Sequence, residues 1–417
     1  MAITRRRFVR GISAVAGLAA AGPSVRSAFA AQGVAGSSRV NRVAVIGAGI
    51  VGASIAYNLA RRGCDVVVIE KNRPASQASG NSFAWVNASW FDTPHSYFTL
   101  RTHALNEYHR LAQDVDIPIS WGGSLEWYES AEQQNEVIEG VGRIQGSGAP
   151  TWMIDAENAS AIEPNLQIDR DRRIAWCARD AAIDPGGTTR ALLERVTDYG
   201  GAVLYPATVT GIEQRGNGLR IRSNVETFEA DLAVVAAGVG ASEIARMAGL
   251  DIDPLRPATP GIIVTTEPMP AIIGAVAYTS DTHFHQRADG RMVLGEKAGP
   301  PGTEAHRALL DGRPNVYPTS DLAKAHAARV IGTARRYLPK IADAKVESAG
   351  IGWRPLPLDG LPVIGHPLST PGLYLAAMHS GVTLAPIVGH LAAMEILDGV
   401  RVELLADFRY ERLRPGP

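Results

Sequence analysis

Residues 43–70, VAVIGAGIVGASIAYNLARRGCDVVVIE, decide the fold of this chain. They begin with an apolar run that is short enough for a buried parallel strand. Gly47, Gly49 and Gly52 follow in G-x-G-x-x-G spacing, and apolar residues then recur at helical spacing. A second apolar strand ends at the acidic Glu70. Strand, glycine turn, helix, strand and acid in this order predict a dinucleotide-binding βαβ unit.

Each marked position of such a unit has a physical purpose. Gly47 permits the tight turn, Gly49 lets the backbone approach a pyrophosphate, and Gly52 lets the helix pack against the strand. The Glu70 carboxylate can accept hydrogen bonds from both ribose hydroxyls, and it would repel a 2′-phosphate. These residues alone therefore leave FAD or NAD as the cofactor.

The N-terminus has the pattern of an export signal. Residues 4–10, TRRRFVR, precede a run of small apolar residues, and Ala28-Phe29-Ala30 supplies an A-x-A cleavage site. We therefore expect a twin-arginine signal over 1–30, cleaved after Ala30, and a periplasmic or otherwise exported protein that needs the Tat export machinery. A membrane anchor is the alternative, but the apolar run is shorter than the roughly 20 residues of a spanning helix.

Charge and length narrow the class of protein. The 417-residue chain has a formal net charge of −1, and removal of 1–30, with five arginines and no acids, would lower it to −6. This balance argues against nucleic acid as a partner. The remaining chain is long enough for two domains. Cys64 and Cys177 are interpreted as small buried residues, although an oxidising compartment would permit a bridge, and the sequence shows no metal-ligand spacing.

A second kind of pattern interrupts the βαβ alternation. Amphipathic helical patterns over 97–115 and 131–146 flank a strand at 121–128. After about residue 255 the sequence predicts strands of an antiparallel sheet, with Asp289-Gly290 as a hairpin turn. We therefore expect an inserted α+β domain with a mainly antiparallel sheet inside an α/β fold.

Later stretches are expected to complete the dinucleotide fold. Thr188 can cap a helix over 189–199, and strands are expected at 202–209 and 219–223. The buried strand 232–237 runs into Gly238 and brings a second backbone turn beside the first. The final helix is expected to begin at Thr383.

Four stretches together resemble the D-amino acid oxidase superfamily of FAD-dependent amine oxidoreductases, which contains glycine oxidase, sarcosine oxidase and D-amino acid dehydrogenase. They are GAGIVGASIAYNLARRGCDVVVIE (47–70), DPGGTTRALLERVTDYGGAV (184–203), LAVVAAGVGAS (232–242), and the C-terminal GWRPLPLDGLPVIG with LYLAAMHSGVTLAPIVGHLAAMEI. The resemblance covers nearly the whole mature chain, and it selects FAD over NAD.

The resemblance also implies a domain organisation and a cofactor site. Segments 40–95, 175–254 and 350–417 would form the Rossmann-like FAD-binding domain, and 96–174 with 255–349 the substrate domain. By resemblance the helix beginning at Thr383 would direct its positive end at the flavin, where reduced flavin gathers negative charge. The loop 71–82 is a candidate for wrapping the diphosphate because it directly follows the ribose acid, and a merely structural loop is the alternative. The expected FAD-binding residues are Gly47, Gly49, Ile50, Val51, Gly52, Glu70, Lys71, Ser79, Gly80, Asn81, Ser82, Val209, Ala236, Gly238, Ser380, Gly381, Val382 and Thr383.

Arg354 is the residue that the resemblance assigns to the substrate. It matches the family's Arg-Pro motif, and a guanidinium fits a carboxylate with two parallel hydrogen bonds. Such a clamp would hold the substrate α-carbon over flavin N5 for hydride transfer, giving an imine that water hydrolyses. The expected substrate is a D-amino acid, glycine or an N-methylated glycine, and the electron acceptor is oxygen or a respiratory carrier.

Two histidines complete the expected catalytic set. His283 falls where relatives often have a tyrosine, His285 is expected on the same face, and His379 lies in the loop beside the flavin ring. A histidine could bind an anion when protonated or take the amine proton when neutral, and polar residues on a half-exposed sheet are the alternative. No cysteine lies near Arg354 and no histidine lies in 76–87, where some relatives tether their flavin, so we expect dissociable FAD. An NAD-dependent dehydrogenase and a non-catalytic binding relative are the rival hypotheses.

Overall fold

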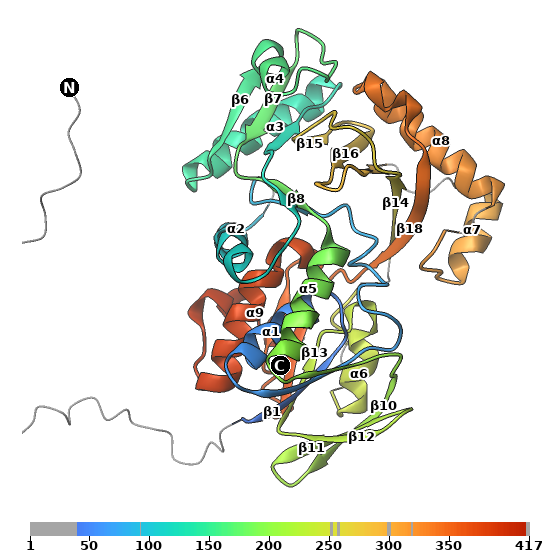
Figure 1. Ribbon diagram of the computed structural model, residues 1–417. Coiled ribbons are helices and arrows are strands. Elements are labelled where there is room, and N and C mark those ends of the chain that lie inside the picture. Colours follow the sequence, from blue (N-terminus) through green and yellow to red (C-terminus); the bar gives the residue numbers. More distant parts are fainter. Residues whose placement is uncertain are drawn as a thin grey trace, which may run out of the picture. The chain divides into compact units, whose positions relative to one another are not determined.

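The computed structural model describes residues 40–91, 93–250, 253–256, 259–297, 302–317 and 320–413 (Figure 1). The expected twin-arginine signal over 1–30 lies outside the described residues, so export stays a prediction. Every element named below belongs to the unit Val40–Pro417.

A six-stranded sheet is assembled from three separate parts of the chain. Its order is β19-β20-β13-β1-β2-β9, with all neighbours parallel except β19 and β20. The strands are β1 (Arg42–Ile46), β2 (Asp65–Ile69), β9 (Ala202–Leu204), β13 (Leu232–Val235), β19 (Val363–Gly365) and β20 (Leu373–Ala377). The expected α/β fold of Rossmann type is confirmed.

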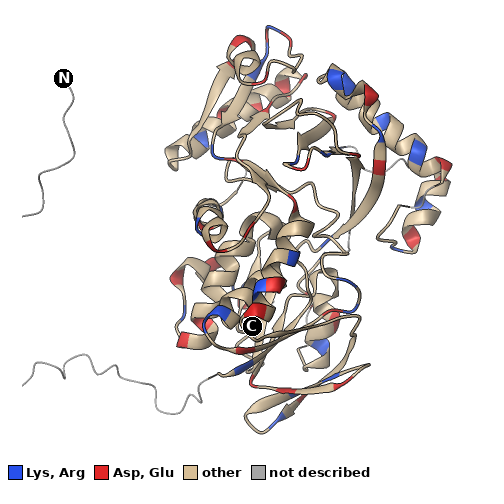
Figure 2. Cartoon of the chain, viewed as in Figure 1, with Lys and Arg blue, Asp and Glu red and all other residues tan. Residues whose placement is uncertain are grey.

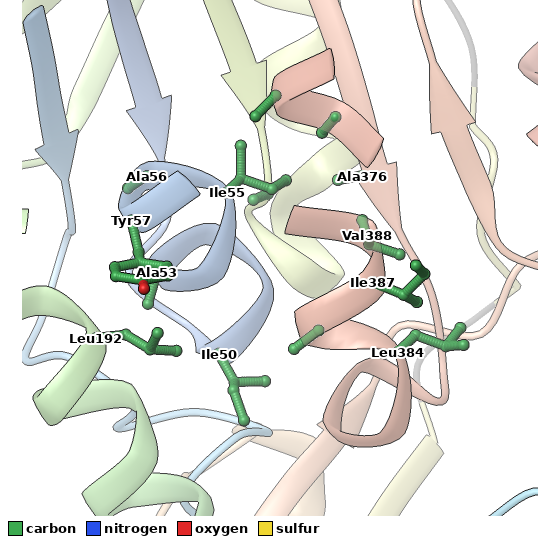
Figure 3. Close-up of a cluster of buried hydrophobic side chains, with 14 of the residues drawn as sticks. Ile50, Ala53, Ile55, Ala56, Tyr57, Leu192, Ala376, Leu384, Ile387 and Val388 are labelled. Atoms are coloured by element: carbon green, nitrogen blue, oxygen red, sulfur yellow. The ribbon is translucent and has the colours of Figure 1, made fainter. Parts of the chain in front are cut away.

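Four helices share the core on one side of this sheet. They are α1 (Ile50–Arg61), α2 (His95–Asp114), α5 (Pro185–Asp198) and α9 (Gly381–Asp398). Figure 3 shows α1 between α5 and α9, with Tyr57 and Leu192 on one side of α1 and Ile387 and Val388 on the other. Burial of these large apolar side chains provides the main stabilising free energy of the α/β part.

The final helix is a core helix by its contacts. Among the described residues, α9 alone is long and apolar enough to cross a membrane, but 67% of it is buried within the fold. The Tyr108 hydroxyl of α2 donates a hydrogen bond of 2.5 Å to the Val382 carbonyl of α9. Gly389 brings α9 so close to α1 that an added Cβ would lie 2.3 Å from Ser54 Oγ.

The second large sheet has eight strands in the order β18-β14-β17-β16-β15-β5-β7-β6. Only the pair β15 and β5 is parallel, so the expected mainly antiparallel sheet is confirmed. Helix α8 (Asp321–Arg335) packs on one face through Ala327 and Val330. The strands are β5 (Ser124–Glu126), β6 (Thr151–Asp155), β7 (Arg173–Cys177), β14 (Thr259–Thr266), β15 (Val276–Tyr278), β16 (Thr282–Gln286), β17 (Met292–Glu296) and β18 (Val346–Arg354).

Two small sheets and five further α-helices complete the strands and α-helices that the structure describes, which also include four short 3-10 helices. One sheet joins β10 (Val209–Arg215), β11 (Gly218–Ser223) and β12 (Thr227–Ala230), and the other joins β3 (Trp85–Val86), β8 (Ala181–Ile183) and β4 (Ile119–Ser120). The helices are α3 (Ala131–Gly146), α4 (Ala156–Ile162), α6 (Ala241–Met247), α7 (Glu304–Asp311) and α8 (Asp321–Arg335).

One expected strand is wrong. The run 202–209 is two strands, because β9 ends at Leu204 and Pro206, which has no N–H to donate, precedes β10. Strand β10 leaves the parallel sheet and pairs with β11 instead.

The helix expected over 189–199 begins one turn earlier than the sequence predicted. Asp184, not Thr188, is its N-cap, because the Gly186 amide donates to Asp184 Oδ1 at 3.0 Å. Pro185 occupies the first helical turn, where its missing N–H has no cost. The Thr188 hydroxyl instead donates to the Asp184 carbonyl at 2.8 Å.

The expected domain boundaries at 175 and 350 fall inside β7 and β18, and both strands belong to the eight-stranded sheet. Helix α2, expected in the substrate domain, contributes Leu100, Leu105 and Leu111 to the same core as α1 and α9. By sheet and core membership, α2 therefore belongs with the α/β part.

The two cysteines form no disulfide, and the charged residues of the described elements do not separate by sign. Cys64 and Cys177 are buried and free, as expected, and burial raises the pKa of their thiols to about 11 and about 12. Basic and acidic positions are interspersed over the described elements (Figure 2). Pairs such as Arg220 with Glu229, 2.7 Å apart, are typical of a solvated surface.

The close contact of α1 and α9 gives a stability prediction. Gly389→Ala would place a methyl group 2.6 Å from the Ser54 carbonyl oxygen, so the helices must separate. We expect the free energy of unfolding in urea to fall by about 2 kcal/mol. Gly142→Ala in α3 is the matched control, because its Cβ would meet open space, and it should raise stability by about 0.5–1 kcal/mol. Equal stability of Gly389→Ala and the wild type would contradict the packing described.

Candidate active site

The glycine turn is held against the end of β13. Gly47 has φ +110°, and a Cβ there would lie 2.5 Å from the Ala236 carbonyl oxygen. A Cβ on Gly52 would lie 2.1 Å from the Gly47 carbonyl oxygen. The amide of Ile50 donates to Ser79 Oγ at 3.0 Å, which ties the loop 71–82 to the start of α1. Only glycine can occupy positions 47 and 52 without displacing the backbone of a neighbouring residue.

A cavity of about 130 Å³ lies along this turn, and we call it the glycine-turn cavity. It adjoins the N-terminus of α1, where backbone amides and the helix dipole favour an anion such as a diphosphate. The cradle thus fits the expected dinucleotide. The expected cofactor residues that line it are Gly47, Gly49, Ile50, Val51, Lys71, Ser79, Ser82, Ala236, Gly238, Gly381 and Val382.

Four expected cofactor residues line neither this cavity nor the larger one described below. Glu70 is 8% exposed, and its carboxylate accepts hydrogen bonds of 2.9 Å from the amides of Ala48 and Asn72. Gly52 serves packing, and Gly80 closes a turn through its amide to the Ala75 carbonyl at 2.8 Å. Val209 is buried at the start of β10. Cofactor contacts by these four residues stay predictions.

A larger cavity of about 620 Å³ adjoins the first, and we call it the large cavity. The two cavities share the lining residues Ala78, Ser82, Pro355, His379 and Val382. The structure brings the expected catalytic residues together here. The expected site residues in its lining are Asn81, Ser82, His283, Arg354, His379, Ser380, Val382 and Thr383.

Helix α9 meets the large cavity with its N-terminus. The helix begins at Gly381, two residues before the expected start, and within the described chain no side chain caps it. Its first amides and positive end are therefore available to an acceptor in the cavity. Thr383 has a structural task, because its hydroxyl donates to the Trp85 carbonyl at 3.2 Å and its Oγ1 accepts from the Asn87 amide at 3.4 Å.

Arg354 presents its charge to the large cavity. It is the last residue of β18, and the missing side chain of Gly261 on β14 makes room for it, since a Cβ there would lie 3.3 Å from Arg354 Nε. Its guanidinium forms no hydrogen bond or ion pair with another residue that the structure describes. A cation without a partner at a cavity wall is the arrangement expected for a carboxylate-binding group.

The histidines of β16 are neutral. The Phe83 ring contacts both, with centroid distances of 4.3 Å to His283 and 5.0 Å to His285, so the two share a face as expected. Burial lowers the pKa of His283 to about 3, with a further contribution from Arg354, and lowers that of His285 to about 4. The His283 ring is therefore neutral at pH 7 in this arrangement, and its role toward a substrate stays a prediction. His285 Nε2 lies 2.7 Å from the Phe83 carbonyl oxygen.

His379 lies in both cavity linings and keeps exposed surface there. Desolvation of its ring lowers its pKa to about 4, and the charges of Arg354 and Arg101 act in the same direction. The imidazole is thus neutral at pH 7 and can accept a proton.

An aromatic wall of the large cavity was not predicted from the sequence. Trp85, Trp90 and Tyr278 form it, with ring centroids 5.5 Å apart for Trp85 and Tyr278 and 5.9 Å apart for Trp90 and Tyr278. The buried Asp180 fixes this wall by accepting from Trp85 Nε1 at 3.1 Å and from Ser89 Oγ at 2.5 Å. Burial raises the pKa of Tyr278 to about 12, so its hydroxyl remains a donor.

Arg101, which lines the same cavity from α2, was not predicted either. The available signal was an arginine at the fourth position after Tyr97, on the apolar face of a predicted helix. Among the residues that the structure describes, no group of three or more His, Cys, Asp or Glu side chains could hold a metal ion.

A glycine turn at the end of a parallel strand, with a large cavity beside it, is the arrangement of a dinucleotide-binding protein with a ligand site next to the dinucleotide. Comparison with known families gives the group: the model of the DAO family, FAD dependent oxidoreductase, matches residues 42–394. The chain belongs to this family, and it is an FAD-dependent enzyme. The expected resemblance is confirmed, and the hypotheses of an NAD-dependent dehydrogenase and of a non-catalytic relative are wrong.

Individual relatives agree with this membership. Glycine oxidase of Geobacillus kaustophilus (strain HTA426) is 25% identical over 360 residues, which are 84% of this chain and 91% of that protein. An opine oxidase subunit of Agrobacterium tumefaciens (strain Ach5) is 24% identical over 386 residues, 88% of this chain and 96% of that one. The crystal structure of the Geobacillus kaustophilus glycine oxidase matches with a TM-score of 0.78 at 21% identity, covering 90% of this chain and 100% of that chain, and so shares the fold.

Buried neutral His285 gives a pH prediction. Its folded pKa of about 4 lies below the unfolded value near 6.5, so the unfolded chain binds more protons between these values. Stability is therefore lost as pH falls below about 6.5, and His285 alone should account for about 2 kcal/mol at pH 5. We expect His285→Gln to flatten the dependence of unfolding free energy on pH between 4 and 6.5. The exposed His103→Gln is the control, and an unchanged slope in His285→Gln would refute the assignment.

Proposed function

We propose that this enzyme oxidises an amine that carries a carboxylate, such as a D-amino acid, glycine or N-methylated glycine, to an imine. The single observation that carries the proposal is the unpaired Arg354 guanidinium in the wall of the large cavity. The names of the relatives support the same class, because one is a glycine oxidase and another belongs to an opine oxidase.

The chemistry divides between cofactor and chain. Bound FAD supplies the acceptor for the hydride that leaves the α-carbon of the substrate, while an N–H proton is lost and the C=N bond forms. Arg354 holds the carboxylate and so fixes the α-carbon in place. His379 and His283 are unprotonated in the lining, with pKa values of about 4 and about 3, so each has a ring nitrogen that can accept a hydrogen bond from the substrate amine, whose proton passes to water. Water then hydrolyses the imine to a carbonyl and an amine.

The aromatic wall supports this division of roles. Trp85, Trp90 and Tyr278 exclude water from one side of the cavity, which strengthens the ion pair between Arg354 and a carboxylate. The Tyr278 hydroxyl, protonated at neutral pH, is a second donor on the same wall. FAD is proposed to be dissociable, because both cysteines, Cys64 and Cys177, are outside the two cavity linings.

Substitution of Arg354 tests the carboxylate clamp. Arg354→Gln removes one partner of a charge-assisted pair. We expect the second-order rate constant for anaerobic flavin reduction to fall, and the loss should correspond to about 2–5 kcal/mol of transition-state free energy. Arg354→Lys should recover part of this loss. Arg190→Gln, at an exposed arginine of α5 outside both linings, is the control. Flavin reduction at the wild-type rate in Arg354→Gln would remove the clamp from the mechanism.

A screen of substrates tests the reaction itself. The purified holoenzyme is mixed without oxygen with glycine, sarcosine and a series of D-amino acids, and bleaching of the visible flavin bands is followed. We expect at least one carboxylated amine to bleach the flavin. Bound flavin that none of them reduces would end the proposal. Reoxidation in air, or only after a quinone is added, then distinguishes an oxidase from a dehydrogenase.

We also propose that the protein is exported by the Tat pathway to the periplasm or an equivalent compartment. The support is the sequence TRRRFVR at 4–10 with the A-x-A site at 28–30. Export of a folded protein suits a cofactor that is bound inside it.

The twin arginines give a prediction that is independent of catalysis. The double substitution of Arg5 and Arg6 by lysine should leave the uncleaved precursor, with its FAD, in the cytoplasm, because the pair is the recognised part of such signals. Arg26→Lys, in the same segment, should be exported normally. Fractionation and immunoblotting measure both, and export of the double variant at the wild-type level would contradict the pathway.

A further inference from the structure

A second guanidinium lies in the wall of the large cavity. Arg101 of α2 is 5% exposed, and its Nε donates to the Asn87 carbonyl at 3.0 Å. Its guanidinium carbon lies 5.5 Å from the centre of the Tyr97 ring. Neither Nη atom forms a hydrogen bond with another residue that the structure describes. The two Nη atoms of this buried cation are therefore available to a ligand in the cavity.

No carboxylate of the described chain neutralises Arg101 directly. Asp180 is the acid whose charge acts on it, but the Asp180 oxygens accept from Trp85 Nε1 at 3.1 Å and from Ser124 Oγ at 2.7 Å. Asp359, the acid of the cavity lining, is paired with Arg412 at 2.7 Å. A buried charge without a partner is costly, so an anion in the cavity would stabilise the fold at this point.

The two arginines come from different elements, α2 and β18, and both line the large cavity. The positive charges of both guanidiniums lower the pKa of His379, which lines both cavities. The positive charge of Arg354 also contributes a lowering of the pKa of Tyr278 and of His283. Arg101 instead lies with Tyr97 and beside Asn87, which the lining also includes. The cavity lining therefore offers two guanidinium groups whose Nη atoms donate to no other residue that the structure describes.

We propose that the substrate is an amine with two carboxylates, one bound by Arg354 and the other by Arg101. The substrate class is that of N-carboxymethylated or dicarboxylic amino acids. The proposal rests on the proposed amine oxidation and names the substrate class of the same site. Arg101 is then the residue that selects dicarboxylates, because a monocarboxylate leaves its buried charge unpaired.

Matched substrate pairs test the proposal without any variant. Iminodiacetate and sarcosine share the secondary amine and one carboxylate, and D-aspartate and D-alanine differ in the same way. We expect the second-order rate constant for anaerobic flavin reduction of the holoenzyme to be about 10- to 100-fold higher for the dicarboxylate of at least one pair, the worth of a charge-assisted hydrogen bond. Equal constants within both pairs overturn the proposal. Failure of all four amines to reduce the flavin instead contradicts the proposed function.

Substitution of Arg101 locates the preference. In Arg101→Gln the constant for the preferred dicarboxylate should fall to within about 3-fold of that for its monocarboxylate partner, whose own constant changes less than 3-fold. Arg101→Lys should keep part of the preference, since it keeps the charge. Arg179→Gln is the control and should behave as the wild type. Arg179 lies outside both linings and donates at 2.6 Å to Asn106, which belongs to α2 as Arg101 does. An equal loss for both substrates means that Arg101 serves the flavin or the fold, and it overturns the proposal.

A binding measurement separates recognition from oxidation. Thiodiacetate and methylthioacetate carry sulfur in place of the amine, and they differ by one carboxylate. Calorimetric titration of the holoenzyme should give at least 10-fold tighter binding of thiodiacetate, and this difference should disappear in Arg101→Gln but not in Arg179→Gln. Equal affinity for the two compounds in the wild type contradicts the proposal even where amine oxidation is established. Flavin content and thermal unfolding of each variant confirm that folded holoenzymes are compared.

Discussion

The contact of α1 with its surroundings is the constraint on which both cavities depend. At its start, Gly47 and Gly52 let the helix meet the end of β13 with no side chain between them, and on its flank Gly389 brings α9 against Ser54. A close-packed interior transmits any added atom as a displacement, because there are no voids to absorb it. The glycine-turn cavity at one end of α1 and the N-terminus of α9 therefore keep a fixed relation. His379 stands two residues before α9 and lines both cavities, so this contact also fixes the position of His379.

Local signals predicted the elements whose causes are local. The βαβ unit, α3 and the hairpin at 289–290 each follow from a period or a turn residue in the element itself. Two errors also have local causes: Asp184 with Pro185 is a stronger helix start than Thr188, and Pro206 divides an apparent strand. Glu70 shows the limit of a motif, because its oxygens already bind two backbone amides in the folded chain.

The walls of the large cavity could be predicted only in part, because they combine residues that are far apart in sequence. Arg354 was found through its Arg-Pro motif, whereas Arg101, Trp85 and Tyr278 belong to no motif and meet only in the folded chain. Desolvation and the neighbouring positive charges lower the pKa of His283 to about 3 and that of His379 to about 4, so both rings are neutral at pH 7. The lining of the large cavity therefore combines two arginines with two neutral histidines, an arrangement that residue types alone do not reveal.

The order of strands in the six-stranded sheet has a consequence for biosynthesis. The central strand β1 is made early, but its neighbour β13 and the next strand, β20, come from about 190 and 330 residues later, and α9 is made last of all the long helices. A ribosome releases the chain from its N-terminus, so the turn at Gly47 must wait, without its packing partners, until nearly the whole sequence has emerged. The cofactor cradle is thus a product of the completed chain. Any fragment released early has the dinucleotide motif in its sequence and no site to bind the dinucleotide.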